Sequence, residues 1–202
     1  MTREPRIGVL SLQGDVREHL RALEESGAHA RPVGSASDLG EVSGLVIPGG
    51  ESTTMSLLAV RDGLLAPLRE ARQGGMPLYG SCAGMIMLAD RVLDARPDQE
   101  TIGGLDVTVR RNAFGRQVDS FETDISVEGI GEPPFPAVFI RAPCVEAVGA
   151  SVRVLARVEG ADGADTIVAV AQGPLLATSF HPELTGDLRI HEMFIEMVRQ
   201  YS

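Results

Sequence analysis

Short apolar segments alternate with amphipathic segments through the first half of the chain, and this alternation constrains the fold more than any other feature. Because the apolar segments are nearly continuous, they are typical of parallel strands buried on both faces. The amphipathic segments have the apolar spacing of helices that pack on a sheet. The pattern therefore predicts an α/β protein in which helices cover both faces of a parallel sheet. We expect strands at 6–12, 44–50 and 76–80, and helices at 15–28, 53–75 (with a break near Gly63) and 83–93.

From about residue 101 the pattern changes to short strand-like segments separated by turn residues. These strands would add antiparallel pairs to the parallel sheet. No repeat, low-complexity tract or Pro/Gly/Ser linker divides the sequence, which predicts one domain over residues 1–202. We expect strands at 105–111, 119–127, 137–143, 151–158, 166–172 and 174–180, and a closing helix at 187–201.

Charge and cysteine content argue against several classes of protein. The net charge is −10, so the chain lacks the basic excess that binds nucleic acid or an anionic membrane. The N-terminal residues lack the apolar region and cleavage site of a signal peptide, and no apolar run reaches the roughly 18 residues of a membrane helix. Two cysteines are too few for a disulfide framework. We expect a cytoplasmic protein.

The segment "LYGSCAGMIML" (78–88) places Cys82 between a strand-like and a helix-like run, with Gly80 and Gly84 on either side. Glycines at these positions would relieve the clashes of a tight turn that presents a nucleophile. The following helix would direct its positive end toward the sulfur and favour the thiolate. The Ala83 N–H would be free to bind a developing oxyanion. The alternative is a small buried hydrophobic residue, which free cysteine often is.

A second pattern lies in "TSFHPEL" (178–184). His181 and Glu183 are two residues apart, so both would point to one side of an extended segment, and Pro182 restricts the backbone between them. A carboxylate on one ring nitrogen fixes the tautomer and leaves the other nitrogen to take the proton of a thiol. The alternative is a surface turn in which both polar side chains face water.

The remaining histidines and the second cysteine carry no such pattern. His19, His29 and His191 lie on or beside predicted helices, and we expect them on solvated faces. Cys144 has no flanking glycines, and we expect it to be a thiol without a part in the chemistry.

Paired glycines follow the second predicted strand in "LVIPGGESTT" (45–54). Backbone N–H groups can approach a ligand closely there. Glu51 and Ser52 come next, at the carboxyl end of the strand, where open α/β sheets bind ligands. Because an acidic residue repels phosphate, a ligand with an ammonium group fits better. The same residues are compatible with a plain helix N-cap at Ser52 or Thr53.

The motifs "GSCAG", "PGGES" and "SFHPE" on an alternating α/β chain resemble those of class I (triad-type) glutamine amidotransferases. The segments "GVLSLQGDVREHL", "RNAFGRQVDSFE", "FIRAP" and "ATSFHPELTGDLRIHEMF" are similar to one family of this class, the glutaminase subunits of two-component pyridoxal 5'-phosphate synthases. The resemblance extends from about Ile7 to Tyr201. It implies a three-layer, flavodoxin-like fold with a mostly parallel central sheet and added antiparallel strands.

The resemblance also implies an activity, the hydrolysis of L-glutamine to L-glutamate and ammonia. Cys82 would attack the side-chain amide, His181 would act as general base, and Glu183 would orient and stabilise the imidazolium. The Gly50 and Ala83 amides would form the oxyanion hole.

Other family positions bind the substrate. Spacing in the sequence alone does not decide which arginine binds the α-carboxylate of glutamine, because Arg110 and Arg116 are as suitable as Arg111. The glutamine-binding positions of the family match Gly50, Glu51, Ser52, Arg111, Ile140 and Arg141.

The resemblance implies a protein partner. Family members pass the ammonia to a synthase subunit, in assemblies of twelve glutaminases around twelve synthases. Gln13 matches a family position near the substrate site and the interface, so we expect partner docking to reshape the oxyanion hole there. No metal or cofactor is implied for the glutaminase. All 18 basic residues are arginines, so this chain has no lysine to form an imine with pyridoxal phosphate.

Two alternatives stay open. The glutaminase of another amidotransferase, such as imidazole glycerol phosphate synthase, would share the triad but lack "RNAFGRQVDSFE". A non-catalytic relative could use Cys82 as a redox-sensing thiol, but this would leave His181 and Glu183 unexplained.

Overall fold

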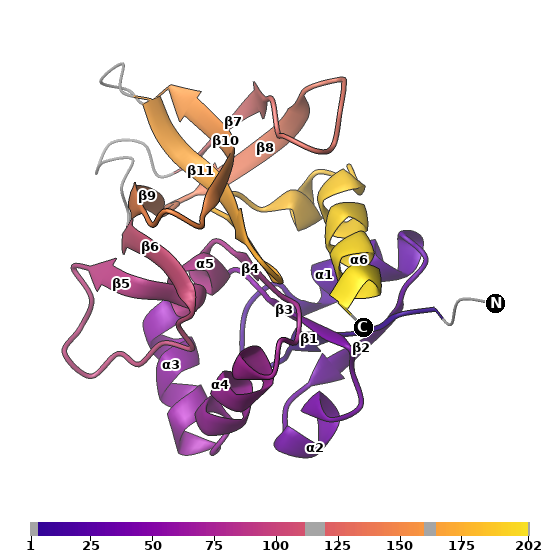
Figure 1. Ribbon diagram of the computed structural model, residues 1–202, viewed down its shortest axis with the longest axis vertical. Helices are drawn as coiled ribbons and strands as arrows, with labels where there is room; N and C mark the ends of the chain where they lie inside the picture. The colour runs from indigo at the N-terminus through magenta and orange to yellow at the C-terminus, as the bar shows by residue number, and fades with distance from the viewer. Residues whose placement is uncertain (1–3, 112–119, 160–164, 202) are drawn as a thin grey trace.

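A computed structural model describes residues 4–111, 120–159 and 165–201 of the chain. Most strands join one sheet in the order β2-β1-β3-β4-β12-β11-β9-β6-β5, with β10 paired to β11, whereas β7 and β8 form a separate antiparallel pair (Figure 1). The strands are β1 (Arg6–Leu10), β2 (His29–Val33), β3 (Gly44–Ile47), β4 (Leu78–Ser81), β5 (Ala89–Leu93), β6 (Leu105–Arg110), β7 (Ser120–Ile125), β8 (Phe135–Ile140), β9 (Cys144–Val148), β10 (Arg153–Glu159), β11 (Asp165–Gln172) and β12 (Leu175–Thr178).

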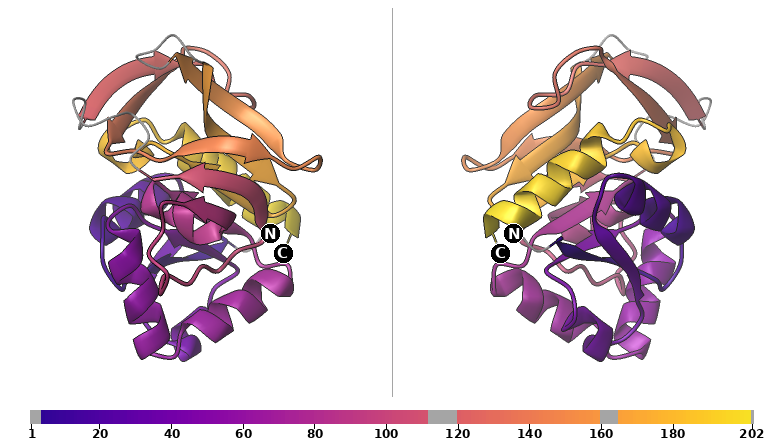
Figure 2. Two further views of the ribbon diagram at one scale, coloured as in Figure 1. Left: turned by 90° about the vertical axis from the view of Figure 1, so that its left-hand side faces the viewer. Right: turned by 90° about the vertical axis from the view of Figure 1, so that its right-hand side faces the viewer.

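Helices cover both faces of the sheet, as Figures 1 and 2 show. Helices α1 (Val16–Glu25) and α6 (Arg189–Tyr201) pack on one face, where Phe194 and Val198 join the core beneath them. Helices α3 (Ser52–Arg61), α4 (Leu65–Gln73) and α5 (Ala83–Leu88) pack on the other face with the short α2 (Ala36–Leu39). These three layers confirm the predicted α/β architecture.

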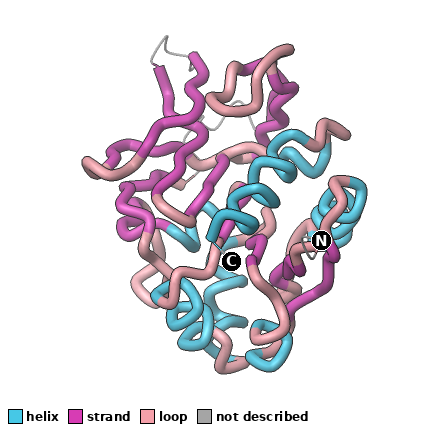
Figure 3. The backbone as a smooth tube through the Cα atoms, turned by 45° about the vertical axis from the view of Figure 1, so that its right-hand side comes forward, coloured by secondary structure: helices cyan, strands magenta, loops and turns pink. Residues whose placement is uncertain are grey.

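Strands β1, β3, β4 and β12 lie side by side and parallel in the centre of the sheet. Strands β3, β4 and β12 are buried along their whole length, as expected for strands covered on both faces. Their carboxyl ends meet at one edge, so the loops that follow them are brought together. The later strands are mostly antiparallel, and apart from β12 they lie toward one end of the molecule (Figure 1), the end that is mostly strand and loop in Figure 3.

Some predicted boundaries were right and others were wrong. The helix predicted at 53–75 is divided where expected, with Gly63 at φ 67° between α3 and α4. The helix predicted at 83–93 ends at Leu88, and the chain continues as β5, because pairing with β6 outweighs its local helical pattern. Strands β2 and β9 and helix α2 were not predicted, since their short segments carry little periodicity.

Within the described residues, no helix combines the length and apolar character needed to span a bilayer.

The expectation of solvated histidines was wrong for two of them. His19 and His191 are completely buried between α1, α6 and the sheet, whereas His29 is exposed as expected. Their helical positions explain this: His19 lies four residues before Leu23, and His191 lies three residues before Phe194, on the core-facing side of each helix.

Burial of these neutral histidines predicts acid sensitivity. Burial lowers the pKa of His191 to about 4 and that of His19 well below its usual 6.5. As the pH falls below 6.5 the unfolded chain takes up protons that the folded chain does not, so the free energy of unfolding decreases. For His191 the decrease amounts to about 3 kcal/mol between these pKa values.

The test is urea unfolding between pH 7 and pH 4 on the wild type, His191→Leu and the exposed control His29→Leu. We expect His191→Leu to flatten the pH dependence and His29→Leu to retain it. Equal pH dependence in wild type and His191→Leu would show that His191 is not buried in its neutral form.

Candidate active site

Cys82 occupies the turn between β4 and α5 with φ 49°, in the left-handed region that residues other than glycine rarely adopt. A Cβ on Gly80 would lie 2.4 Å from the backbone of Gly84, and a Cβ on Gly84 would lie 2.1 Å from the Ile47 carbonyl oxygen. Neither position has room for a side chain, which confirms the steric role predicted for both glycines. The turn holds Cys82 in a strained conformation at the carboxyl edge of the sheet.

The parallel pairing of β12 with β4 brings the second motif to this turn. Thr178 lies opposite Ser81, and its carbonyl oxygen accepts a hydrogen bond from the Cys82 N–H at 2.8 Å. The chain then leaves β12, and the His181 N–H donates to the Val138 carbonyl oxygen of β8 at 2.8 Å. Backbone hydrogen bonds from two strands therefore fix His181 beside the cysteine.

His181 and Glu183 form a buried pair. His181 Nδ1 lies 2.8 Å from Glu183 Oε1, and the two side chains are 5% and 0% exposed. Their proximity was predicted, but the extended backbone was wrong: Pro182–Leu184 form a 3₁₀ turn, η1, which folds Glu183 back to the ring. The surface-turn alternative is excluded by this burial.

The other ring nitrogen, Nε2, is the one left for Cys82, because it is buried and has no hydrogen-bond partner among the described residues. The sulfur of Cys82 lies 3.9 Å from the Ile140 carbonyl oxygen. Burial disfavours the imidazolium, but Asp15, Cys82 and Glu183 outweigh it and raise the pKa of His181 to about 12. A protonated His181 places a positive charge beside the sulfur of Cys82.

A second carboxylate lies beside the same ring and was not identified from the sequence. Asp15 Oδ2 is 3.4 Å from His181 Nδ1, and this contact holds the pKa of Asp15 below its usual value. Asp15, His181 and Glu183 offer ligand atoms within 4.8 Å of one another, a spacing that a metal ion could use. Because His181 Nδ1 already bonds Glu183, we interpret the group as an orienting pair with an extra carboxylate.

Glu51 caps helix α3, so the alternative of an N-cap at Ser52 or Thr53 does not hold. Its carboxylate accepts hydrogen bonds from the Thr53 and Thr54 N–H groups at 3.1 and 2.7 Å. Burial works against ionisation, but these bonds outweigh it and lower the pKa of Glu51. The residue is therefore an anion at neutral pH, and it is half exposed at the carboxyl end of β3.

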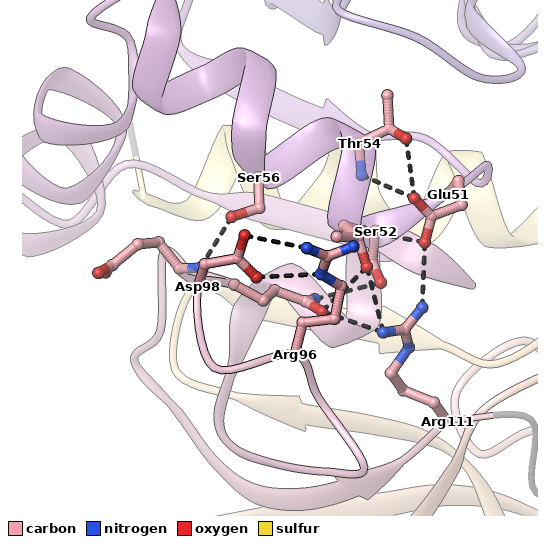
Figure 4. A network of polar contacts seen from close by, with 10 residues as sticks. Glu51, Ser52, Thr54, Ser56, Arg96, Asp98 and Arg111 are labelled. Atoms are coloured by element: carbon pink, nitrogen blue, oxygen red, sulfur yellow. Dashed lines mark hydrogen bonds and ion pairs between the residues drawn. The ribbon is translucent and has the colours of Figure 1, made fainter.

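Arg111 lies against this carboxylate, with Nη2 at 3.0 Å from Glu51 Oε1 (Figure 4). Its Nη1 also donates to Gln99 Oε1 at 3.1 Å, and Gln99 in turn donates to Ser52 Oγ at 3.2 Å. Arg110 instead pairs with Glu146 and Asp94. The structure thus places Arg111, and not Arg110, beside Glu51 and Ser52, while Arg116 lies outside the described residues.

The candidate oxyanion residues come from two segments that follow neighbouring parallel strands, β4 and β3. Ala83 directly follows Cys82 as the first residue of α5, and Gly50 has φ 144° in the loop after β3. Gln13 packs on this loop: its Nε2 donates to the Glu51 carbonyl oxygen at 3.1 Å, and a Cβ on Gly50 would lie 2.4 Å from it. The loop that precedes α1 therefore fixes the conformation of the Gly50 segment.

Two further predicted residues come from the end of β8. Ile140 is 37% exposed, and its carbonyl oxygen faces the sulfur of Cys82. Arg141 is exposed and has φ 43°. It is a second strained residue, next to the Cys82 turn between β4 and α5, which we call the elbow. Cys144 lies apart on β9, where burial and Glu146 raise its pKa to about 11, so its thiol is unreactive at neutral pH.

Comparisons with known proteins agree with this geometry. The model of the SNO glutamine amidotransferase family matches residues 9–200. The chain is 66% identical to the pyridoxal 5'-phosphate synthase subunit PdxT of Parafrankia sp. over 96% of its length and 94% of the relative's. It is 62% identical to the PdxT of Acidothermus cellulolyticus, with 98% and 95% covered. A crystal structure of a glutamine amidotransferase superposes with a TM-score of 0.87 at 47% identity, covering 95% of this chain and 98% of that one.

Proposed function

The chain belongs to the SNO glutamine amidotransferase family, and we propose from this that it hydrolyses L-glutamine and supplies the ammonia for pyridoxal 5'-phosphate synthesis. One observation carries the proposal: the strained Cys82 turn lies beside a buried histidine–glutamate pair in a chain that matches the family almost from end to end. The named relatives are subunits of pyridoxal 5'-phosphate synthase, which supports that destination for the ammonia.

In the proposed reaction Cys82 Sγ attacks the side-chain amide carbon of glutamine. As the C–N bond breaks, His181 gives its Nε2 proton to the departing ammonia, and a γ-glutamyl thioester remains on Cys82. A water molecule then gives a proton to His181 and attacks the thioester, which releases glutamate and restores the thiolate. Glu183 holds Nδ1 of His181 through both steps, because its hydrogen bond fixes the tautomer and stabilises the imidazolium.

We assign the binding of the oxyanion that forms when Cys82 attacks the amide carbon to the backbone N–H groups of Gly50 and Ala83. The Ala83 amide is suited to this task because it directly follows the nucleophile. The Gly50 amide depends on the loop that Gln13 contacts. We propose that the synthase subunit acts on this contact and so completes the hole.

Glutamine is assigned to the group of residues around Glu51. The ionised carboxylate of Glu51 suits the α-ammonium group of glutamine, while Arg111 suits its α-carboxylate. Because the two side chains pair with each other at 3.0 Å, a bound glutamine would exchange this contact for contacts to its own charges. Ser52, Gly50, Ile140 and Arg141 complete the proposed pocket.

Glu51→Gln is expected to raise KM for glutamine by roughly 10- to 100-fold with a smaller change in kcat, because a neutral amide cannot pair with the ammonium group. Steady-state kinetics with the synthase subunit present measure this. The amide oxygen can still cap α3, so the melting temperature should change little. An unchanged KM would place the ammonium contact on another residue.

The proposed partner is a pyridoxal 5'-phosphate synthase subunit, in an assembly of twelve copies of each chain. Ammonia transfer can be tested with glutamine whose side-chain nitrogen carries an isotope label, in the presence of the synthase, ribose 5-phosphate, glyceraldehyde 3-phosphate and excess unlabelled ammonium. We expect the label in the pyridine ring of the product. A ring nitrogen that reflects the unlabelled pool would contradict direct transfer, and absence of glutamate would contradict the hydrolysis itself.

A further inference from the structure

Two buried histidines continue the row of polar groups behind the proposed triad. Oε1 of Glu183 bonds His181, while its other oxygen, Oε2, lies 3.3 Å from His19 Nε2. His19 Nδ1 in turn lies 3.0 Å from His191 Nε2. The row therefore runs from the sulfur of Cys82 through one carboxylate to two histidines on different helices, α1 and α6.

This row is closed to solvent beyond His181. The side chains of Glu183 and His19 are 0% exposed, and His191 is fully buried. Both imidazoles also meet the ring of Tyr79 edge to face, at centroid distances of 6.1 and 6.3 Å. This packing fixes the ring orientations, so the histidine nitrogens have few alternative partners.

Charge selects one proton arrangement along the row. Burial, His191 and His181 lower the pKa of His19 well below 6.5, so this imidazole carries one proton at neutral pH. If the proton were on Nδ1, the lone pair of Nε2 would face the carboxylate of Glu183. With the proton on Nε2, the N–H lies on the side of Glu183, whose Oε2 is 3.3 Å from Nε2 but outside hydrogen-bonding geometry, so Nε2 has no hydrogen-bond partner among the described residues. Nδ1 can then accept the N–H of His191.

The same arrangement suits His191. Its Nε2 carries the proton that goes to His19, which leaves Nδ1 as a bare nitrogen, and Nδ1 is buried without a partner among the described residues. A bare acceptor left unpaired costs less than an unpaired N–H beside an apolar core would. In this arrangement the N–H of His191 is directed at an acceptor, and the N–H of His19 lies nearest to the Glu183 carboxylate.

We propose that His19 is a positioning residue for the candidate triad, which holds the second oxygen of Glu183, and that His191 holds His19 in the donating tautomer. The inference rests on the proposed function. Glu183 is a desolvated carboxylate whose Oε2 accepts a hydrogen bond from the Ser81 hydroxyl at 3.3 Å and lies 3.3 Å from the unpartnered Nε2 of His19. Without His19 the negative charge of Glu183 is less stabilised. Glu183 would therefore stay protonated, and so neutral, up to a higher pH. A neutral Glu183 no longer stabilises the imidazolium of His181, and the thiolate of Cys82 is lost with it.

Titratable groups on every neighbouring element enter this balance. Among the described residues, those that act on Glu183 or His19 are Asp15, Tyr79, His181 and His191, while Cys82 acts on Tyr79 and His181. All of them are present in each variant below, so differences between the variants report the change at position 19.

The first test compares His19→Leu, which removes the donor, with His19→Gln, whose side-chain amide can still donate to Glu183. With the synthase present, we expect kcat to fall roughly 10- to 100-fold in His19→Leu and to return to within about threefold of wild type in His19→Gln, with KM changed less than about twofold. His29→Leu, exposed on β2, should behave as wild type. Wild-type kcat in a folded His19→Leu overturns the inference.

The second test needs no glutamine and so separates this inference from the proposed function. In a Cys144→Ala background, the rate of Cys82 alkylation by iodoacetamide is measured against pH. We expect the midpoint of thiolate formation to rise by about 1 pH unit in His19→Leu and not in His19→Gln. A purely structural His19 would alter the melting temperature but not this midpoint, so an unmoved midpoint overturns the inference. If His19→Leu does not fold, His19→Met, which also lacks a donor, takes its place.

The two proposals fail in different ways. Suppose that the pH midpoint of Cys82 alkylation depends on His19, yet the wild-type protein makes no glutamate with the synthase. That result would overturn the proposed function and leave the positioning role of His19 intact.

Discussion

Cys82→Ala is expected to abolish glutamine hydrolysis, with kcat reduced by at least about 10⁴-fold, because no other group can form the thioester. The second cysteine cannot replace it: Cys144 lies on β9, and its thiol is held protonated with a pKa of about 11. The fold should persist, since Cys82 is a small side chain and alanine fits the same space. The measurement is glutamate formation with the synthase subunit, together with the melting temperature of each variant.

Cys144→Ala is the matched control, because it removes the same chemical group at a buried position away from the elbow. It should retain activity close to that of the wild type. Turnover by Cys82→Ala above the background of uncatalysed hydrolysis would refute the nucleophile assignment, whatever the control shows.

Gly84→Ala is expected to damage both stability and activity. The added methyl carbon would lie 2.1 Å from the carbonyl oxygen of Ile47, a backbone atom in the centre of the sheet that cannot move aside. The turn and α5 must shift away from β3, which we expect to cost about 2–4 kcal/mol of unfolding free energy. Because α5 directly follows Cys82 and carries the Ala83 amide, kcat should fall by more than about 100-fold even in the folded fraction.

Gly40→Ala provides the control for a glycine substitution. Its φ is −67°, and its nearest neighbour would be 3.5 Å from the new carbon, so the change should be neutral or slightly stabilising. Urea unfolding and glutamate formation on both variants make the comparison. If Gly84→Ala matched Gly40→Ala in stability and kcat, the close approach of the elbow to β3 would not be real.

The elbow could be predicted from the sequence because its constraints are local. Gly80, Cys82 and Gly84 lie within five residues, and each glycine is required by a backbone contact that the turn itself creates. The family was also readable from long motifs, and the comparisons confirm it. The parallel order of the central strands followed from their continuous apolar character.

Other features depend on contacts between distant segments, and the sequence did not reveal them. Asp15 meets His181 only because the loop before α1 docks on the loop after β3. Strand β5 forms because β6 pairs with it, against a local helical pattern. Glu51 was placed correctly at the carboxyl end of β3, but its capping role required the geometry of α3.

His19 and His191 are a different case, because the signal was present. Each occupies the apolar face of its helix, at helical spacing from Leu23 and Phe194. A polar residue on such a face is buried unless the helix is unpacked, so both should have been predicted as core residues that need partners.

The central claim is most directly tested by measuring glutamate production from L-glutamine by the purified chain, alone and with a pyridoxal 5'-phosphate synthase subunit. We predict low activity alone and a steep rise with the partner, because we propose that docking at Gln13 completes the oxyanion hole. Activation by the synthase of the histidine pathway, and not by this one, would favour the alternative amidotransferase. No glutamate in either case, from folded protein, would contradict the glutaminase assignment and leave Cys82 as a sensing or structural thiol.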